Sequence, residues 1–207
     1  MVDRSNWHVE QIDKKIAAGM VVENHYLHRK PPMSFAHGIV ADGELKGVIT
    51  YGVPASRHLQ KGACPTDPGS VIELNRMWLS DELPRNSESW AVSRSLKLLP
   101  PRIVVSYADT REGHYGYVYR AINFHYAGWT DMERKTPRFD YIPIDPTKHT
   151  REATRSGVAR RVRRKPKVKY WIATGNRSER RHLESVCGWP VMDWHEKPPP
   201  LMDHVQI

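Results

Sequence analysis

Arg76 is the first residue whose position suggests chemistry. It lies in a predicted strand over residues 71–79, where period-two alternation places it on one face with the apolar residues Ile72, Leu74 and Trp78. An arginine among apolar side chains must be paired or functional, because an unpaired buried charge is costly. Its natural partner is Asp109, which ends the predicted neighbouring parallel strand. The two form either a structural ion pair or part of a ligand site, since ligands of open α/β sheets bind at the carboxyl ends of strands.

A second group of polar aromatic residues precedes a predicted hairpin. His25, Tyr26 and His28 lie within four positions of one another, although a chain with 11 histidines also produces such groups by chance. His25 or His28 together with Asp109 would offer ligands for a metal ion. The sequence contains no H-x-x-x-H or His-His-carboxylate spacing, so the presence of a metal stays open.

The segment Arg85-Asn86-Ser87-Glu88-Ser89 comes directly before a predicted helix. Asn86 or Ser87 can act as the N-cap, with a side-chain oxygen that accepts a backbone N–H. The same helix N-terminus, with an arginine beside it, is also a ready binding site for an anion. Ser89 falls inside the first turn, where it has no capping role, and we predict that it contacts a cofactor.

Positive charge is concentrated late in the chain. The formal net charge is +9 and the isoelectric point about 9.6, and residues 148–169 contain a single acid, Glu152. Such a segment favours phosphate partners, which bind through the release of counterions. We predict that it contacts double-stranded DNA through Arg160, Arg161, Arg163, Arg164, Lys165, Lys167 and Lys169. Tyr170 and Trp171 follow directly and either pack in the core or stack on a base.

The elements that must position these residues can be outlined from the pattern. We expect a helix over residues 6–18, a β-hairpin over 38–51 with its turn at Asp42-Gly43, and a loop over 52–69. Strand 71–79, helix 90–99 and the apolar strand 103–108 form a βαβ unit, whose crossover should be right-handed. A helical segment over 112–123, a strand over 125–129, an edge strand over 139–144 and a last strand over 168–173 follow. The C-terminus is expected to be irregular.

This order predicts an α/β protein with a mixed sheet. We divide the chain into a catalytic core over residues 1–147 and a basic segment with a C-terminal strand and tail, packed on the core, over 148–207. No run of 18 apolar residues and no signal peptide is present, so we expect a soluble, intracellular protein without a membrane partner. Free thiols are the default for Cys64 and Cys187, with a single disulfide as the alternative.

Several segments together resemble the GNAT acyltransferase family, namely ADGELKGVITYG, VIELNRMWLSDELPRNSESW, IVVSYAD and GYVYRAINFHYAGWT. The resemblance implies splayed parallel strands and a helix N-terminus that holds the pyrophosphate of acetyl-CoA, here through Arg85, Asn86, Ser87 and Ser89. It also implies that Tyr119 is the general acid to the departing thiolate; a buried tyrosine that packs its ring is the alternative. The loop over residues 83–89 lacks the family's glycines, which argues against ordinary CoA binding.

Shorter strings resemble a narrower group, the Mom family of phage proteins with a GNAT-like fold. They are E-L-N-R-M-W, P-R-N-S-E-S, S-Y-A-D, G-H-Y-G, Y-R-A-I-N-F and R-K-P-K-V-K-Y-W, within residues 25–171. The resemblance implies addition of a carbamoylmethyl (methylcarbamoyl) group to the N6 amino group of adenine in phage DNA, which protects the DNA from host restriction. It places the protein in the cytoplasm of the infected bacterium. It implies an active site that contains Arg76, Asp109, Tyr119, His25, Tyr26 and His114.

The group donor is not fixed by these residues. Transfer from acetyl-CoA to an amine yields an acetamide, whereas a carbamoylmethyl group carries its carbonyl one carbon further out. Either another donor is used, such as a glycine-derived one, or further chemistry follows, which a metal would assist. An ordinary GNAT N-acetyltransferase and a non-catalytic DNA-binding protein are the alternatives. Oligomeric state, DNA sequence preference and the need for a helper protein are left open.

Overall fold

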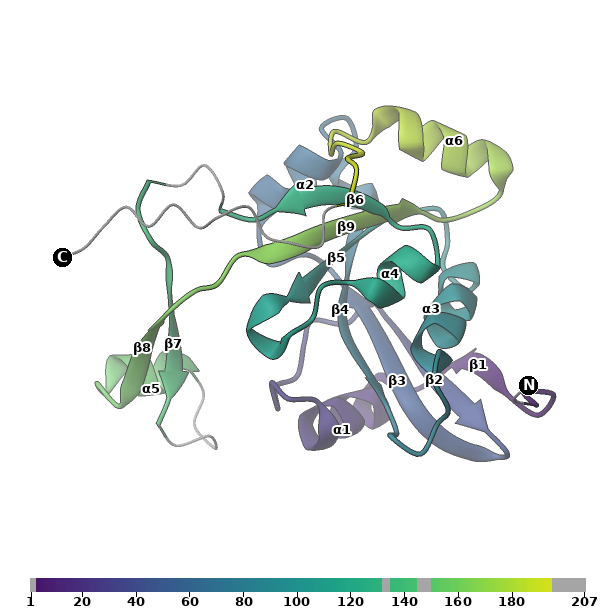
Figure 1. The fold of residues 1–207 in the computed structure, drawn as a ribbon, viewed down its shortest axis with the longest axis horizontal. Helices are drawn as coiled ribbons and strands as arrows, with labels where there is room; N and C mark the ends of the chain where they lie inside the picture. The colour runs from purple at the N-terminus through teal and green to yellow at the C-terminus, as the bar shows by residue number, and fades with distance from the viewer. Residues whose placement is uncertain (1–2, 132–134, 145–149, 195–207) are drawn as a thin grey trace.

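The computed structural model describes residues 3–131, 135–144 and 150–194. Its main sheet has seven strands in the order β1-β2-β3-β4-β5-β9-β6, and only β4 and β5 run parallel (Figure 1). The strands are β1 (His8–Gln11), β2 (Phe35–Ala41), β3 (Glu44–Gly52), β4 (Val71–Leu79), β5 (Ile103–Asp109), β9 (Lys167–Ala173) and β6 (His125–Trp129). The predicted fold class, α/β with a mixed sheet, is confirmed.

Helices cover both faces of this sheet. They are α1 (Lys14–Asn24), α2 (Arg57–Ala63), α3 (Ser87–Lys97), α4 (Tyr117–Ala121) and α6 (Arg177–Val186), with 3-10 turns at Pro68–Ser70 and Thr110–Glu112. Ile49 packs with residues of α3, while its neighbour Val48 packs with residues of α1. Val104 and Val105 divide in the same way between α3 and the pair α2 and α6. Helices α3 and α4 therefore lie on one face, and α1, α2 and α6 lie on the other.

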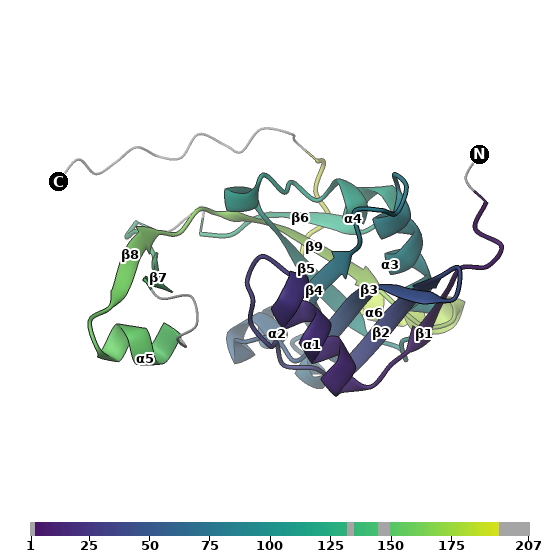
Figure 2. The same cartoon turned by 90° about the horizontal axis from the view of Figure 1, so that it is seen from below.

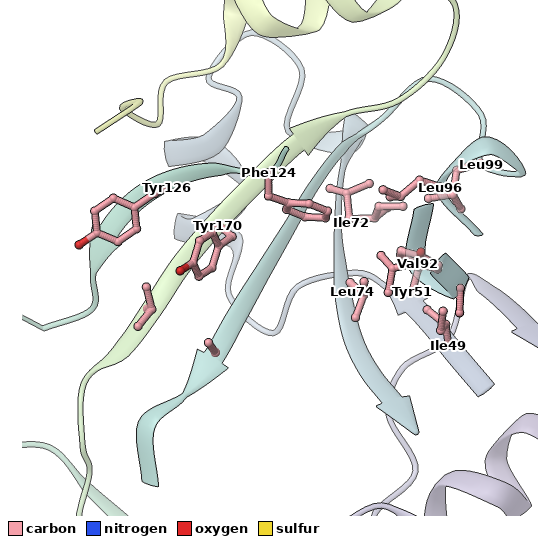
Figure 3. Close-up of a cluster of buried hydrophobic side chains, with 14 of the residues drawn as sticks. Ile49, Tyr51, Ile72, Leu74, Val92, Leu96, Leu99, Phe124, Tyr126 and Tyr170 are labelled. Carbon is pink, nitrogen blue, oxygen red and sulfur yellow. The ribbon is translucent and has the colours of Figure 1, made fainter. Parts of the chain in front are cut away.

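The larger core lies between the sheet and the α3 face. Aromatic and aliphatic side chains from β3, β4, α3, β6 and β9 meet there, and Figure 3 shows Tyr51, Leu74, Val92 and Tyr170 among them. One polar contact is enclosed in this core. Ser95 of α3 lies 2.7 Å from Nδ1 of His37 and 2.8 Å from the Tyr51 hydroxyl. These buried polar groups satisfy one another, which fixes α3 on the sheet.

Three predictions about where helices occur were wrong. The expected helix over 6–18 is instead the short strand β1 followed by α1, and Asp13 caps α1 by accepting the N–H of Lys15. The expected loop over 52–69 contains α2. The expected irregular C-terminus contains α6, which begins with a capping box between Asn176 and Glu179. Within the described residues, no helix is long and apolar enough to span a membrane.

The hairpin and the central strands agree with the prediction. Strands β2 and β3 join through Asp42 and Gly43, whose φ angles of 52° and 86° are those of a type I′ turn. Strand β4 has the predicted bounds, and so does β6. The thiols of Cys64 and Cys187 are both free, as predicted.

Strands β4 and β5 separate after a short parallel pairing. The pairing runs from Val71 opposite Ile103 to Leu74 opposite Ser106 and stops there, although β4 continues to Leu79 and β5 to Asp109. Beyond this point β4 pairs with β3 and β5 pairs with β9. The two carboxyl-terminal halves thus form a fork, which confirms the predicted splayed parallel strands.

A second, two-stranded sheet lies apart from the main one, as Figure 2 shows. It pairs β7 (Phe139–Pro143) with β8 (Ala159–Arg163), and α5 (Thr150–Arg155) lies against it. We call β7, α5 and β8 the arm. The predicted strand over 139–144 exists, but it belongs to the arm and not to the edge of the main sheet.

The arm lies in the connection between β6 and β9. Where it leaves and rejoins the sheet, the N–H of Thr130 donates to the carbonyl of Lys167 and the N–H of Lys167 donates to Oγ1 of Thr130, both at 2.8 Å. Strand β9 then enters the main sheet between β5 and β6. The proposed division at residues 147 and 148, which lie outside the described residues, stays a prediction. The strands β7 and β8 on either side of it pair with each other.

Candidate active site

A β-bulge at Asn75 sets the direction of the Arg76 side chain. In the pairing of β3 with β4, Tyr51 lies opposite Leu74 and Thr50 lies opposite Arg76, so Asn75 is an extra residue on β4. Residues directly opposite each other share a face of an antiparallel pair. Because one residue is inserted between them, Leu74 and Arg76 point to opposite faces.

The bulge overturns the predicted surroundings of Arg76. Ile72 and Leu74 pack with α3, whereas Trp78 packs with α1. Of the three residues predicted to share a face with Arg76, only Trp78 does so. Strict alternation gave the wrong face because an inserted residue leaves no mark in the pattern of residue types.

The side chain of Asn75 holds the bulge in place. Its Oδ1 accepts a hydrogen bond of 2.7 Å from the Thr50 hydroxyl, and its Nδ2 donates one of 2.8 Å to the carbonyl of Pro32. Its own carbonyl accepts a hydrogen bond of 2.5 Å from Nη1 of Arg76. The bulged residue therefore also orients the guanidinium.

The guanidinium of Arg76 is only partly satisfied by protein groups. Its Nε is buried and has no hydrogen-bond partner among the described residues. Burial lowers the pKa of Arg76 and nearby Arg29 lowers it further, while Tyr26 and Glu73 raise it. A buried donor without a partner carries a free-energy cost, and such groups are common where a ligand completes the site.

Asp109 does not pair with Arg76, which corrects the predicted ion pair. Its Oδ2 lies 2.6 Å from Nζ of Lys167, and its Oδ1 accepts the backbone N–H of Arg111 at 3.1 Å. Burial alone would raise the pKa of Asp109, but the Lys167 ammonium and the Arg111 contacts hold it below its usual value. Asp109 is thus a carboxylate that stays ionised.

Tyr26 lies between two other predicted site residues, His25 and His114. Its ring stacks on that of His25 at a centroid distance of 4.3 Å and meets His114 edge-on at 6.2 Å. Burial raises the pKa of Tyr26 to about 12; Asp109 adds to the rise and Arg76 opposes it. The phenol therefore remains a neutral hydrogen-bond donor near both charges.

His25 is a neutral histidine at neutral pH. Burial, together with the positive charges of Arg76, His114 and His28, lowers its pKa to about 4. Its Nδ1 accepts the backbone N–H of Leu27 at 3.1 Å, which assigns the proton to Nε2. The segment after α1 thus brings an imidazole N–H and a phenol to the fork. His114 joins them from the loop after β5, where its backbone N–H donates to the carbonyl of Asp109.

Tyr119 reaches the fork from the opposite face of the sheet. It lies in α4 and packs against Phe124 at 5.2 Å and Tyr170 at 5.3 Å between ring centroids. Burial raises the pKa of Tyr119, and a hydrogen bond with Ser106 opposes the rise. Because Ser106 is the last residue of β5 that pairs with β4, this hydrogen bond places Tyr119 at the start of the fork. Ring contacts thus join His25, Tyr26 and His114, whereas Tyr119 lies on the other face of the sheet; the catalytic roles of all six predicted residues stay a prediction.

Glu73 is a member of this site that the sequence analysis missed. It lies on β4 at the last paired positions before the fork, opposite Gly52 and one step before Leu74. Burial raises its pKa, against the opposing charges of Arg76 and Lys167, and the described residues offer its carboxylate no hydrogen bond. The available signal was an acid three residues before Arg76 in an otherwise apolar strand.

The N-terminus of α3 has an unusual cap. Asn86 is the N-cap residue with a φ of 68°, and its side chain makes no capping hydrogen bond. The first backbone N–H groups of the helix therefore have no side-chain partner. Asn tolerates this left-handed conformation better than most residues, which explains how the loop turns without glycine. Arg85 is exposed beside it, and its carbonyl accepts a hydrogen bond from Arg4.

Two serines predicted to contact a cofactor already have local partners. The Ser87 hydroxyl is buried and donates to the carbonyl of Pro84 at 2.6 Å. The Ser89 hydroxyl donates to the carbonyl of Asn86 at 3.1 Å. Ser87 thus shapes the loop from inside, while Ser89 keeps its oxygen as an acceptor.

The predicted DNA contacts fall into two groups. Lys167 pairs with Asp109, Arg164 pairs with Asp140 on the arm, and the Lys169 ammonium lies 5.5 Å from the ring centroid of Trp189. The other four are exposed to solvent, namely Arg160, Arg161, Arg163 and Lys165. Among the described residues, no group of three or more His, Cys, Asp or Glu side chains is arranged to hold a metal ion.

The protein therefore belongs to the class of α/β proteins with a mixed sheet whose two parallel strands separate, and its candidate site lies at that separation. The chain belongs to the Mom protein family, whose model matches residues 6–184. Over 127 residues it is 39% identical to the methylcarbamoylase mom of Escherichia phage Mu, covering 58% of this chain and 53% of the relative. The chain thus spans about half the length of that curated relative.

Solved acetyltransferases have similar structures. A GNAT-family acetyltransferase from Bacillus cereus gives a TM-score of 0.46 at 11% identity, covering 82% of this chain and 99% of that one. The ribosomal-protein-S5-alanine acetyltransferase from Vibrio fischeri gives 0.46 at 12% identity, covering 85% and 96%. A Bacillus subtilis acetyltransferase in complex with CoA gives 0.40 at 9% identity, covering 82% and 99%.

Proposed function

We propose that this chain is a transferase that modifies phage DNA, adding a carbamoylmethyl group to the N6 amino group of adenine. The observation that carries the proposal is the buried Arg76 Nε without a partner among the described residues, together with the ring cluster of Tyr26, His25 and His114, all within the matched region of the Mom family. The similarity to a methylcarbamoylase of phage Mu supports the type of group transferred. Such a modification would act in the cytoplasm of an infected bacterium.

The acceptor base must leave its helix to reach this site. The N6 amino group of adenine lies within the stacked duplex, and enzymes that act on a base generally flip it out. Arg76, with its unpaired buried Nε, would donate hydrogen bonds to the flipped base or to the donor carbonyl. The Tyr26 hydroxyl and the Nε2–H of His25, both neutral hydrogen-bond donors, would help to orient the flipped base.

Formation of the new bond at N6 releases a proton, and the chain offers two carboxylates for it. Asp109 is a weak base because Lys167 and Arg111 hold its pKa down, so it would orient the amine or the cation that forms. Glu73 is the better proton acceptor because burial raises its pKa and no hydrogen bond engages it among the described residues. Tyr119, also kept neutral by burial, would donate its proton to the departing end of the donor.

The donor site is the N-terminus of α3. Its uncapped N–H groups and the exposed Arg85 fit the pyrophosphate of a coenzyme A-type donor. Bound acetyl-CoA would supply an activated acyl group, but acetyl transfer alone yields an acetamide. A glycine-derived donor, or a further metal-assisted step, is therefore needed to account for the carbonyl position in the product. The acidic Glu88 in the first turn opposes anion binding there, so the affinity for a diphosphate should be moderate.

The experiment is to co-express the chain with a plasmid and measure the masses of the nucleosides in its DNA. Wild type should yield a heavier deoxyadenosine, and Arg76→Ala and Tyr26→Phe should abolish it. Arg181→Ala, which removes an exposed charge on α6, is the matched control and should leave the yield unchanged. Unmodified DNA from well-folded wild type would overturn the proposal, and acetylation of free amines from acetyl-CoA would then identify an ordinary acetyltransferase.

A further inference from the structure

The arm presents one face that combines aromatic rings with positive charge. In the pairing of β7 with β8, Phe139 lies opposite Arg163 and Tyr141 lies opposite Arg161. Directly opposite residues share a face, and residues two apart on a strand do so as well, so all four lie on the same side of the ribbon. We call these four residues the arm face.

The side chains of the arm face are available to a partner. Arg161 and Arg163 are exposed, and 45% of Tyr141 is exposed. The guanidinium of Arg161 lies 3.6 Å from the centroid of the Phe139 ring, which holds it flat over the ribbon by a cation–π contact. A guanidinium held in this way loses less conformational freedom when it binds a phosphate.

The negative charge of the ribbon lies on its other face. Asp140 alternates with Phe139 and Tyr141, and its carboxylate is bound by Arg164 and lies 3.6 Å from Arg111. Arg160 and Lys165 add exposed positive charge nearby. Within the described part of the ribbon, the arm face therefore carries cations and aromatic rings without an acid.

We infer that the arm face binds duplex DNA, with Arg161 and Arg163 on backbone phosphates and Tyr141 against the sugar-phosphate backbone. The inference rests on the proposed function, in which DNA is the acceptor, and it names the surface and the residues that hold the duplex. A two-stranded ribbon is narrow enough to enter the major groove. Figure 2 shows that the arm extends away from the main sheet.

Contacts at the base of the arm fix it relative to the candidate active site. Nη2 of Arg111 donates to the carbonyl of Arg163 at 3.1 Å, and the Thr110 hydroxyl donates to the carbonyl of Pro166 at 2.7 Å. Thr110 and Arg111 directly follow Asp109 in the loop that leads to His114. DNA held on the arm face is thus held at a set position relative to the fork.

We expect the seven basic residues predicted to touch DNA to divide into two groups. Some bind DNA directly, and the others hold the arm or the candidate site in place. Arg161 and Arg163 should dominate binding, with smaller contributions from Arg160 and Lys165. Arg164 and Lys167 should contribute through the ion pairs that position the arm and Asp109. Lys169, in strand β9 of the main sheet, lies beside Trp189 and should contribute little to DNA binding.

Binding can be measured without any transfer reaction. The purified full chain is titrated against a fluorescein-labelled 20-base-pair duplex, and anisotropy gives Kd over a series of salt concentrations. The double variant Arg161→Ala/Arg163→Ala should raise Kd at least tenfold and reduce the slope of log affinity against log salt by about 2, because each phosphate that the protein neutralises adds about 0.9 to that slope. Tyr141→Ala should raise Kd about fivefold with an unchanged slope.

Two control variants keep the test specific. Arg177→Ala/Arg181→Ala removes the same charge from exposed positions of α6 and should alter Kd less than twofold. Arg161→Lys/Arg163→Lys keeps the charge and should keep the slope. Thermal unfolding of each variant checks that the fold is retained. Equal losses of affinity in the arm and α6 variants, or preference for a single strand of the same sequence, would overturn the inference.

Failure of this inference is distinguishable from failure of the proposed function. Modified nucleosides from cells together with unchanged DNA binding by the arm variant would leave the function standing and remove the arm as the binding surface. Conversely, loss of binding in the arm variant without any modified nucleoside from wild type would keep the surface and remove the proposed reaction.

Discussion

The carboxylate of Asp109 and the ammonium of Lys167 lie 2.6 Å apart at paired positions of β5 and β9. Strand β9 enters the sheet only after the arm, so this ion pair joins the candidate active site to the end of the basic segment. Lys167, predicted to bind DNA, is thus also the partner of Asp109, predicted to be catalytic.

Replacing the cation of this pair should disturb both stability and chemistry. In Lys167→Met the Asp109 carboxylate loses its partner, its pKa rises, and the free energy of unfolding should fall by about 2 kcal/mol, a value reduced for partial exposure. Urea unfolding measures the loss. Lys167→Arg keeps the charge and should lose less than half as much; an equal loss in both variants would show that packing, rather than charge, is responsible.

The cap of α3 should tolerate glycine better than alanine. Asn86 has a φ of 68°, which glycine adopts freely and alanine does not. Asn86→Ala should lower the free energy of unfolding by about 1 kcal/mol, while Asn86→Gly should stay within about 0.5 kcal/mol of wild type. Denaturant titration at one pH measures both, and a greater loss in the glycine variant would reveal a side-chain role that the geometry does not show.

The start of α4 depends on a glycine for two reasons. Gly116 has a φ of 86°, and a Cβ there would collide with the ring of Tyr170. Gly116→Ala should therefore cost about 2–4 kcal/mol of stability, from backbone strain and overpacking together, and should displace Tyr119. Gly113→Ala is the matched control: its φ is 72°, but a Cβ would meet no atom within 4 Å, so about 1 kcal/mol is expected. Thermal or urea unfolding compares the two.

His37 should make stability depend on pH. Burial lowers its pKa in the folded protein to about 4, below the ordinary value near 6.5, so folding favours the neutral imidazole. Its contribution is complete above pH 6.5 and declines as the pH falls toward 4, because the unfolded chain takes up the proton first. Wild type should lose about 2 kcal/mol more than His37→Gln between pH 7.5 and pH 5. Parallel losses in urea titrations of the two proteins would contradict this.

The sequence predicted the central elements well because their signals are local. Strand β4 is bounded by glycine-rich and polar segments, β5 is a continuous apolar run, and the Asp42-Gly43 turn specifies its hairpin. The edge strand β1 was missed because its four residues are mostly exposed and carry no apolar pattern. Asn176 and Glu179, which form the capping box of α6, are a local signal for the start of a helix that the predicted irregular C-terminus left out.

The sequence predicted several residues of the candidate site, but it did not predict which of them contact each other. His25, Tyr26 and His114 form the expected cluster, yet the cation on Asp109 is Lys167 rather than Arg76. That choice depends on the placement of β9 between β5 and β6 and on the bulge at Asn75. Both result from long-range pairing, which neither alternation nor motif spacing records. Glu73 was missed for the same reason, since its burial arises only when β3 and β5 pair with β4 on either side of it.

The hydrogen bonds between Thr130 and Lys167 bring together the two points where the chain departs from the main sheet and returns to it. The arm is therefore a cassette whose two ends meet at the main sheet, and Thr110 and Arg111 hold it beside β5. A change in the length of this cassette would therefore break no strand of the main sheet. Under the proposed function, exchanging this cassette would change how the acceptor is held while leaving in place Arg76, Asp109 and Tyr119, which lie outside it.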